Sequence, residues 1–188
     1  MANVLVPLAP GCEELEAVTI IDLLRRAEIN VTTASLDSGS QVAPVIASRG
    51  VTLLPDVTLD EALKKDYDML VLPGGLPGAD HLDNDPRIHE LLAKLSKADK
   101  YTAAICAAPK VLAHANLLNG KSATSYPGVI DKMELPDTRV SSDNVVVDDK
   151  VITSRGPGTA MDFALTLIQS LSGKTKRDEV ASGLLWSN

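Results

Sequence analysis

Hydrophobic and polar residues follow one another along this chain in blocks whose spacing switches between strand-like and helix-like. The segments at residues 3–9 and 67–72 are apolar except for Asn3 and Asp68, which is typical of strands buried on both faces. Residues 13–28 have helical spacing, with acids in the first turn and arginines in the last, as the helix macrodipole favours. The other expected elements are a β-rich segment at 29–36, a turn at 37–40, two short strands flanking Arg49-Gly50, a short helix at 59–66, a helix from Asp85-Pro86 with Ile88, Leu91, Leu92 and Leu95 buried, a strand near 121–125, a hairpin at 145–156 turning at Asp148-Asp149, and a last helix after Gly156-Pro157-Gly158.

Strands and helices therefore alternate almost throughout the sequence. Such alternation predicts a mostly parallel sheet with helices on both faces, which is the doubly wound α/β architecture. The chain has 188 residues, enough to bury one sizeable core. We therefore expect residues 1–188 to form a single domain.

Composition and charge exclude several function classes. The net charge of −7 offers no basic surface for nucleic acid or an anionic membrane, and aromatic residues, at 3%, are too few for base-stacking platforms. No apolar run approaches the roughly 20 residues that a membrane span needs, and the N-terminal segment lacks the basic start of a signal peptide. Two cysteines form neither a disulfide framework nor a metal cluster. We expect a cytoplasmic protein with free thiols and no bound cofactor or metal.

One of these cysteines stands at the corner between a strand and a helix. The small-residue strand 103–105 ends on Cys106, and Pro109 opens a helical pattern shortly afterwards. A side chain at such a corner points out of both elements, toward the first helical N–H groups, as in a nucleophile elbow. A helix N-terminus also favours the thiolate, so we expect the pKa of Cys106 to lie below that of free cysteine. The alternative is a small buried hydrophobe at a tight turn.

Three unusual loops follow predicted parallel strands and should therefore meet at one edge of the sheet. They are PGCEELE at 10–16, PGGLPGAD at 73–80 and ICAAP at 105–109. Ligands of doubly wound sheets bind at this edge. The loops bring together a thiol, carboxylates and a diglycine whose N–H groups can approach a ligand closely. This set of groups suits acyl transfer or addition to a carbonyl.

A histidine partner for the thiol is not evident. His114 lies on the same helix as Cys106, about 12 Å further along the axis. His89 lies beside the apolar stripe of its own helix and is expected to be solvated. His81 follows the diglycine loop and is the remaining histidine near this edge.

Three segments together resemble the ThiJ/PfpI superfamily, and in particular its YajL-like, parkinsonism-associated deglycase branch. They are LVLPGG at 70–75, AAICAAP at 103–109 and TSRGPGTAMDFAL at 153–165. The resemblance extends from the first strand to the last helix. It implies a flavodoxin-like sheet, a homodimer, and chemistry that needs no cofactor.

The resemblance also implies roles for individual residues. Cys106 matches the reactive cysteine of the family, which is readily oxidised to a sulfinic acid. Glu16 matches a protonated glutamate that is hydrogen-bonded to the cysteine sulfur. Gly75 and Ala107 match the backbone N–H donors of an oxyanion site. Arg26 and Arg49 match arginines near the pocket and the dimer interface.

Other residues near the three loops carry weaker expectations. The placement of Gly74 opposite the cysteine loop favours a part in the pocket. Tyr126 stands where some relatives have a histidine, and because a phenol is a poor base, Tyr126 should shape the pocket or donate a hydrogen bond. Glu13 and Glu14 are expected only to complement the helix dipole. Cys12 is expected to be a buried small residue rather than a resolving thiol.

Two classes of function remain open. The first is a cysteine-dependent enzyme acting on small aldehydes, either as a glutathione-independent glyoxalase or as a deglycase on methylglyoxal and glyoxal adducts of proteins and nucleotides. The second is a non-enzymatic, redox-sensing stress protein or chaperone. Amidase or peptidase activity ranks third, because no histidine partner is evident.

Overall fold

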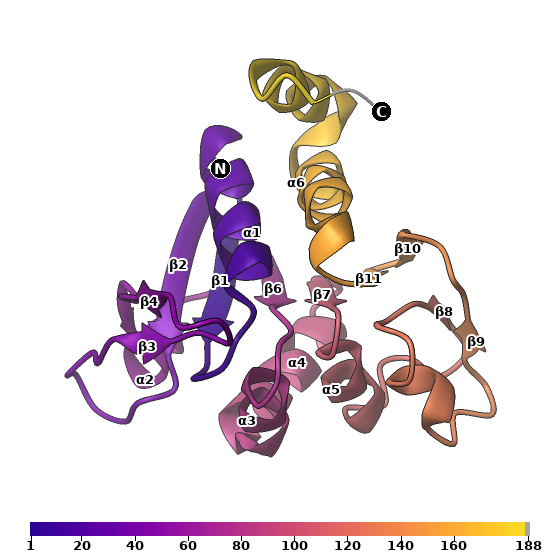
Figure 1. Ribbon diagram of the computed structural model, residues 1–188, viewed down its shortest axis with the longest axis horizontal. Coiled ribbons are helices and arrows are strands. Elements are labelled where there is room, and N and C mark those ends of the chain that lie inside the picture. Colours follow the sequence, from indigo (N-terminus) through magenta and orange to yellow (C-terminus); the bar gives the residue numbers. More distant parts are fainter. Residues whose placement is uncertain (187–188) are drawn as a thin grey trace.

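A seven-stranded sheet lies at the centre of the fold, which the computed structural model describes for residues 1–186 (Figure 1). Its main parallel strands lie in the order β2 (Asn30–Ser35), β1 (Asn3–Leu8), β6 (Met69–Leu72), β7 (Tyr101–Ile105) and β11 (Val151–Ser154). This is the 2-1-3-4-5 order of a flavodoxin-like sheet, so the predicted fold class is confirmed. The edge strands are β5 (Val57–Thr58), parallel to β2, and β10 (Val145–Asp148), antiparallel to β11.

Helices cover both faces of the sheet, as the alternation predicts. One face carries α1 (Glu14–Arg26) and α6 (Ala160–Gly183), and α6 is interrupted at Gly173, where φ is 84°. The other face carries α2 (Leu59–Ala62), α3 (Gly78–Asn84), α4 (Pro86–Lys97) and α5 (Pro109–His114). Among residues 1–186, no helix is both long and apolar enough to cross a membrane.

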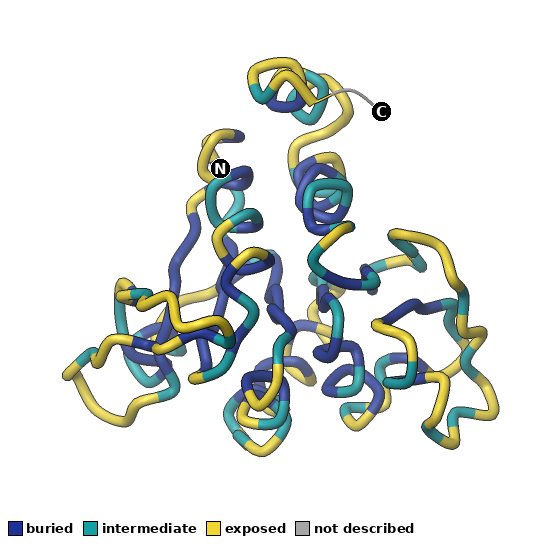
Figure 2. Tube along the Cα trace, viewed as in Figure 1, coloured by how far each residue is buried: buried dark blue, intermediate teal, exposed yellow. Residues whose placement is uncertain are grey.

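Alternate side chains of each central strand enter different cores. Val4 and Val6 of β1 pack under α1 and α6, whereas Leu5 between them packs on the opposite side. All three are fully buried, which explains why this strand reads as an unbroken apolar run. Figure 2 shows the same burial along the central strands and on the helix sides that face them.

Short elements outside the main sheet are β3 (Val45–Ile46) paired with β4 (Thr52–Leu53), β8 (Ser122–Ala123) paired with β9 (Arg139–Val140), and the 3₁₀ turns η1 (Ile130–Lys132) and η2 (Pro157–Thr159). The strand expected near 121–125 therefore exists, but it lies outside the main sheet. The helix expected at 59–66 ends at Ala62, where the bonding tightens into turns: Lys64 N donates to Glu61 O at 3.3 Å and Lys65 N donates to Ala62 O at 3.0 Å. Helix α3 was not predicted, since it begins within a segment rich in glycine and proline.

Candidate active site

The three unusual loops meet at the carboxyl ends of β1, β6 and β7, as predicted. Glu13 N donates to Gly74 O at 2.9 Å, and Gly78 N donates to Gly11 O at 3.3 Å. These bonds join the loop after β1 to the loop after β6. Strand order reverses between these two strands, and the crevice at such a switch point is where doubly wound sheets bind ligands.

Cys106 occupies the predicted corner directly after β7. Its φ of 64° lies in the left-handed region, which side chains other than glycine rarely adopt. Both of its backbone groups are held in place: Cys106 N donates to Ser154 O at 3.0 Å, and Cys106 O accepts from Tyr126 N at 2.9 Å. The neighbouring loops thus maintain the strained backbone that turns the thiol out of the strand. Cys106 is partly exposed.

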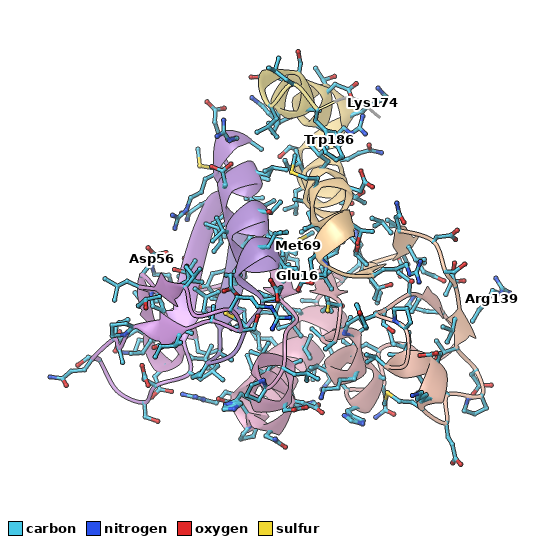
Figure 3. All side chains as sticks on the ribbon, viewed as in Figure 1. Glu16, Asp56, Met69, Arg139, Lys174 and Trp186 are labelled. Atoms are coloured by element: carbon cyan, nitrogen blue, oxygen red, sulfur yellow. The ribbon has the colours of Figure 1, made fainter. Side chains whose placement is uncertain are left out.

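Glu16 lies in the first turn of α1, where the helix start meets the ends of the central strands (Figure 3). Its side chain is fully buried, and Oε2 accepts a hydrogen bond from Gly74 N at 2.9 Å. Oε1 has no hydrogen bond of regular geometry within residues 1–186. Burial raises the pKa of Glu16 to about 7, although Gly74 N–H and the Cys106 thiol act in the opposite direction by donating to the carboxylate.

The pKa of Cys106 is raised to about 12, so the expected lowering is wrong. Burial is the main cause and the Glu16 carboxylate is the second, while the N–H groups of Gly75 and Ala107 lower the pKa less. Helix α5 has six residues and begins only at Pro109, three residues after the thiol. The thiol therefore needs a base, and the adjacent carboxyl, with a pKa of about 7, is suited to that task.

Glycine is required at both positions of the diglycine. A Cβ atom at Gly74 would lie 2.5 Å from the Cβ of Cys106 and 2.9 Å from Glu16 Oε2. Gly75 has a φ of 86°, and its Cβ would lie 2.5 Å from Glu13 N. The predicted close approach of backbone to the site is thus present, and it depends on the missing side chains.

Two glutamates expected only to complement the helix dipole bind a neighbouring turn instead. The Ser48 hydroxyl donates to Glu13 at 2.7 Å and to Glu14 at 3.0 Å, and Arg49 N donates to Glu14 Oε1 at 2.8 Å. Burial raises the pKa of Glu14, but hydrogen bonds from backbone N–H groups and Ser48 outweigh it, and the net effect is a lowered pKa. Nothing in the local sequence signalled this contact, because the partners are more than 30 residues apart.

The two arginines are not in contact with the thiol within one chain. Arg26 is exposed at the end of α1, about 15 Å along the helix axis from Glu16, and its Nε pairs with Asp22 at 2.7 Å. Arg49 is anchored through its backbone, and its side chain is exposed. Their place at an interface remains a prediction.

The histidines take no part in the thiol site. His89 Nε2 bonds to Asp83 O at 2.8 Å, and His114 Nδ1 bonds to Asp83 Oδ2 at 2.7 Å. The His89 side chain is 30% exposed, so it meets solvent in part, as expected. His81 is exposed on α3 and lines a separate hollow with Asp60 and other polar residues. Over the described range, no group of three or more potential metal ligands occurs.

Cys12 is a buried residue as expected, whereas the role of Tyr126 in the pocket stays a prediction. Tyr126 is about half exposed, and its ring lies against Gly156, where a Cβ would be 3.2 Å from the ring. It therefore forms a wall beside the cysteine loop. Cys12 is fully buried, and burial is the main cause that raises its pKa to about 12, which suits an inert core residue.

Known proteins resemble this chain over nearly its whole length. The model of the DJ-1/PfpI family matches residues 2–170. Protein dj-1beta of Drosophila melanogaster is 44% identical over 183 residues, covering 97% of this chain and 96% of the relative. The glutathione-independent glyoxalase DJR-1.2 of Caenorhabditis elegans is 37% identical, and the match covers 97% of this chain and 95% of the relative. The crystal structure of Drosophila melanogaster DJ-1beta is 43% identical and has a TM-score of 0.92; the match covers 100% of this chain and 99% of that structure. The structure of oxidized Toxoplasma gondii DJ-1 is 38% identical and has a TM-score of 0.93; the match covers 100% of both chains.

Proposed function

This chain belongs to the DJ-1/PfpI family, and we propose that it is a cofactor-independent enzyme whose Cys106 adds to small reactive aldehydes. One observation carries the proposal: a fully buried carboxyl, Glu16, with a pKa of about 7, lies beside the sulfur. Such a group exchanges protons near neutral pH, as a histidine does elsewhere. The name of the Caenorhabditis elegans relative, a glutathione-independent glyoxalase, supports the same class of chemistry.

The first step is addition of the thiol to the aldehyde carbon. The Glu16 carboxylate accepts the thiol proton while sulfur forms its bond to carbon, and the C=O π electrons move to oxygen. The resulting oxyanion accepts hydrogen bonds from Gly75 N–H and Ala107 N–H, the two donors that face the sulfur. The protonated Glu16 then returns the proton to that oxygen, giving a hemithioacetal.

The second stage differs between the two candidate activities. For a 2-oxoaldehyde, Glu16 moves the hydrogen on C1 of the hemithioacetal, as a proton, to C2, while the proton of the C1 hydroxyl passes to the C2 oxygen, which yields a 2-hydroxy thioester. Water then displaces the Cys106 thiol and releases a 2-hydroxy acid, so that one water is added and no external oxidant is consumed. For a deglycase, whose substrate is a hemiaminal of the aldehyde with an amine, the Cys106 sulfur would bond to the carbon as the C–N bond breaks, and Glu16 would pass the thiol proton to the departing amine.

We also propose a homodimer. Large apolar side chains are exposed on α1 and around the β3–β4 hairpin, namely Leu15, Val18, Ile46, Val51 and Leu54. Val18 and Leu54 line one shared hollow, so the two elements form a continuous surface. A second copy of the chain would cover this surface and bring Arg26 and Arg49 toward an interface. The free thiols suit a reducing compartment, and we propose the cytoplasm.

The alternative function is redox sensing. Partly exposed Cys106 has two N–H donors that would stabilise a sulfinate, and one solved relative is described as oxidized. A sensor would form the sulfinate with mild peroxide yet release no product from aldehydes. Protection of client proteins as a chaperone belongs to the same alternative.

Lactate release from methylglyoxal without glutathione tests the enzyme proposal. We expect turnover by the unaltered chain, none by Cys106→Ser, and a loss of about 10²-fold or more in Glu16→Gln. Cys12→Ser is the matched control and should retain activity, because Cys12 is buried away from solvent. Equal lactate release by Cys106→Ser and the unaltered chain would refute the proposal.

A further inference from the structure

A small hollow lies between the loop at Tyr126 and the segment that leads into α6. It has a volume of about 270 Å³ and is lined by Tyr126, Pro127, Arg155, Gly156, Pro157, Gly158 and Thr159. Arg155 is the one charged residue in this lining. Arg155 belongs to the segment at 153–165 that resembles the ThiJ/PfpI superfamily, and the resemblance implies no role for this residue.

Backbone hydrogen bonds fix this hollow next to the nucleophile. Cys106 N donates to the carbonyl of Ser154, the residue before Arg155, and Tyr126 N donates to the carbonyl of Cys106. Tyr126 and Arg155 therefore each lie within one or two peptide units of the cysteine backbone, on two different loops. Cys106 is not itself part of the lining, but the hollow lies on the two loops whose backbone is bonded to the cysteine.

The guanidinium of Arg155 has unused binding capacity. Arg155 is half-buried, yet its side chain makes no hydrogen bond or ion pair with any residue from 1 to 186; only its backbone N is bonded, to Asn144 O at 3.3 Å. Arg87, which is also half-buried, is bonded to Asp85, Asp60 and Leu36 O. A partly desolvated charge is costly without a partner, and a guanidinium offers up to five donors.

A carboxylate that could compete for Arg155 lies in an adjoining hollow. That second hollow, of about 300 Å³, shares Tyr126, Pro127 and Arg155 and also contains Asp131. Asp131 is exposed, accepts from Gly128 N at 2.7 Å, and forms no ion pair with Arg155. The hollow of about 300 Å³ thus contains a positive and a negative side chain, whereas the hollow of about 270 Å³ contains only the positive charge of Arg155.

We propose that this hollow is a recognition subsite in which Arg155 binds an anionic group, a carboxylate or a phosphate, carried by the carbonyl substrate. The proposal rests on the proposed function of Cys106, and it adds a preference for anionic aldehydes over neutral ones. The volume lies just below the usual range for ligand pockets, which fits a substrate of only a few carbon atoms. Tyr126, with its ring against Gly156, forms the side wall.

The test compares two alkylating reagents of nearly equal size, iodoacetate and iodoacetamide, which differ in charge. The rate of modification of Cys106 by each reagent is measured by peptide mass mapping, which separates it from Cys12. The ratio of the iodoacetate rate to the iodoacetamide rate should fall about tenfold in Arg155→Gln and be partly retained in Arg155→Lys. Arg139→Gln, an exposed arginine outside the hollow, is the matched control and should keep the original ratio. An unchanged ratio in Arg155→Gln would overturn the proposal.

A second measurement uses the unaltered chain and does not depend on the folding of a variant. Inorganic phosphate and acetate are each added during iodoacetate modification of Cys106, against chloride at equal ionic strength. Stronger protection by phosphate indicates phosphorylated aldehydes, and stronger protection by acetate indicates carboxylated ones. If neither phosphate nor acetate protects Cys106 from iodoacetate better than chloride does, the proposed subsite is overturned.

These outcomes are separable from those of the lactate assay. Methylglyoxal is neutral, so its turnover tests the Cys106 chemistry without Arg155. A chain that releases lactate but shows no charge preference loses only the subsite. If the chain reacts faster with iodoacetate in a way that depends on Arg155 but releases no lactate, the anion subsite is supported and the proposed reaction is refuted.

Discussion

Replacing Glu16 with glutamine should remove a pH dependence that the buried carboxyl imposes on stability. Burial raises the pKa of Glu16 from the ordinary value of 4.5 to about 7 in the folded chain. Below pH 4.5 the carboxyl is protonated in both the folded and the unfolded chain. As the pH rises from there to about 7, the unfolded chain releases the proton first, so the free energy of unfolding falls, and the loss is complete above the folded pKa.

The size of this effect follows from the two pKa values. Each pH unit between them is worth about 1.4 kcal/mol, so the fall amounts to about 3 kcal/mol. Glu16 is fully buried, so solvent screening reduces this figure little. Compared with the roughly 5–15 kcal/mol that stabilise ordinary domains, the fall is large enough to measure.

Urea unfolding at about pH 5 and about pH 8 provides the assay. Glutamine keeps an acceptor for Gly74 N–H but has no proton to release, so Glu16→Gln should lose less stability than the unaltered chain between these conditions. Glu90→Gln is the control, because Glu90 is exposed on α4. If Glu16→Gln and the unaltered chain lose equal stability over this range, burial of the carboxyl is not the source of the dependence.

Three further outcomes are expected. Gly74→Ala should lower the free energy of unfolding by about 1–3 kcal/mol through overpacking, and it should slow the alkylation of Cys106. Gly183→Ala is the control and should have neither effect, because a Cβ at Gly183 meets open space. Equal urea midpoints for the two variants would contradict this prediction. Mild peroxide should oxidise Cys106 before buried Cys12, and mass mapping that finds Cys12 modified first would oppose it. Leu92→Ala should lower the free energy of unfolding by about 2–5 kcal/mol, since Leu92 is fully buried; a loss below about 1 kcal/mol would show that the site collapses around the smaller residue.

The parts of the fold that were predictable depend on local signals. Asp85 and Pro86 mark a helix start by themselves: the Asp85 side chain accepts from Arg87 N at 3.0 Å, and proline occupies the first turn. Runs of apolar residues likewise identified the buried strands, because burial on both faces shows within the segment itself. By contrast, β8 pairs with β9, whose residues lie some distance along the chain, and no local pattern specifies such a pairing.

The site was predictable in its geometry but not in its energetics. The corner at Cys106 and the meeting of three loops follow from strand ends and glycines in the sequence. The pKa of the thiol depends on how deeply the sulfur is buried and on Glu16 beside it, and these are tertiary properties. The same holds for Glu14, whose partners lie in the turn at 48–51.

The two edges of the main sheet are poor templates for a foreign strand. An exposed edge presents unpaired N–H and C=O groups, which invite strand addition and aggregation. Here β5 has two residues and leads directly into α2, while at the far edge Ser122 N donates to Asp148 Oδ2 of β10 at 2.7 Å, which places the start of β8 against that strand. Both edges therefore disfavour the joining of copies sheet to sheet, and the proposed homodimer would have to use another surface.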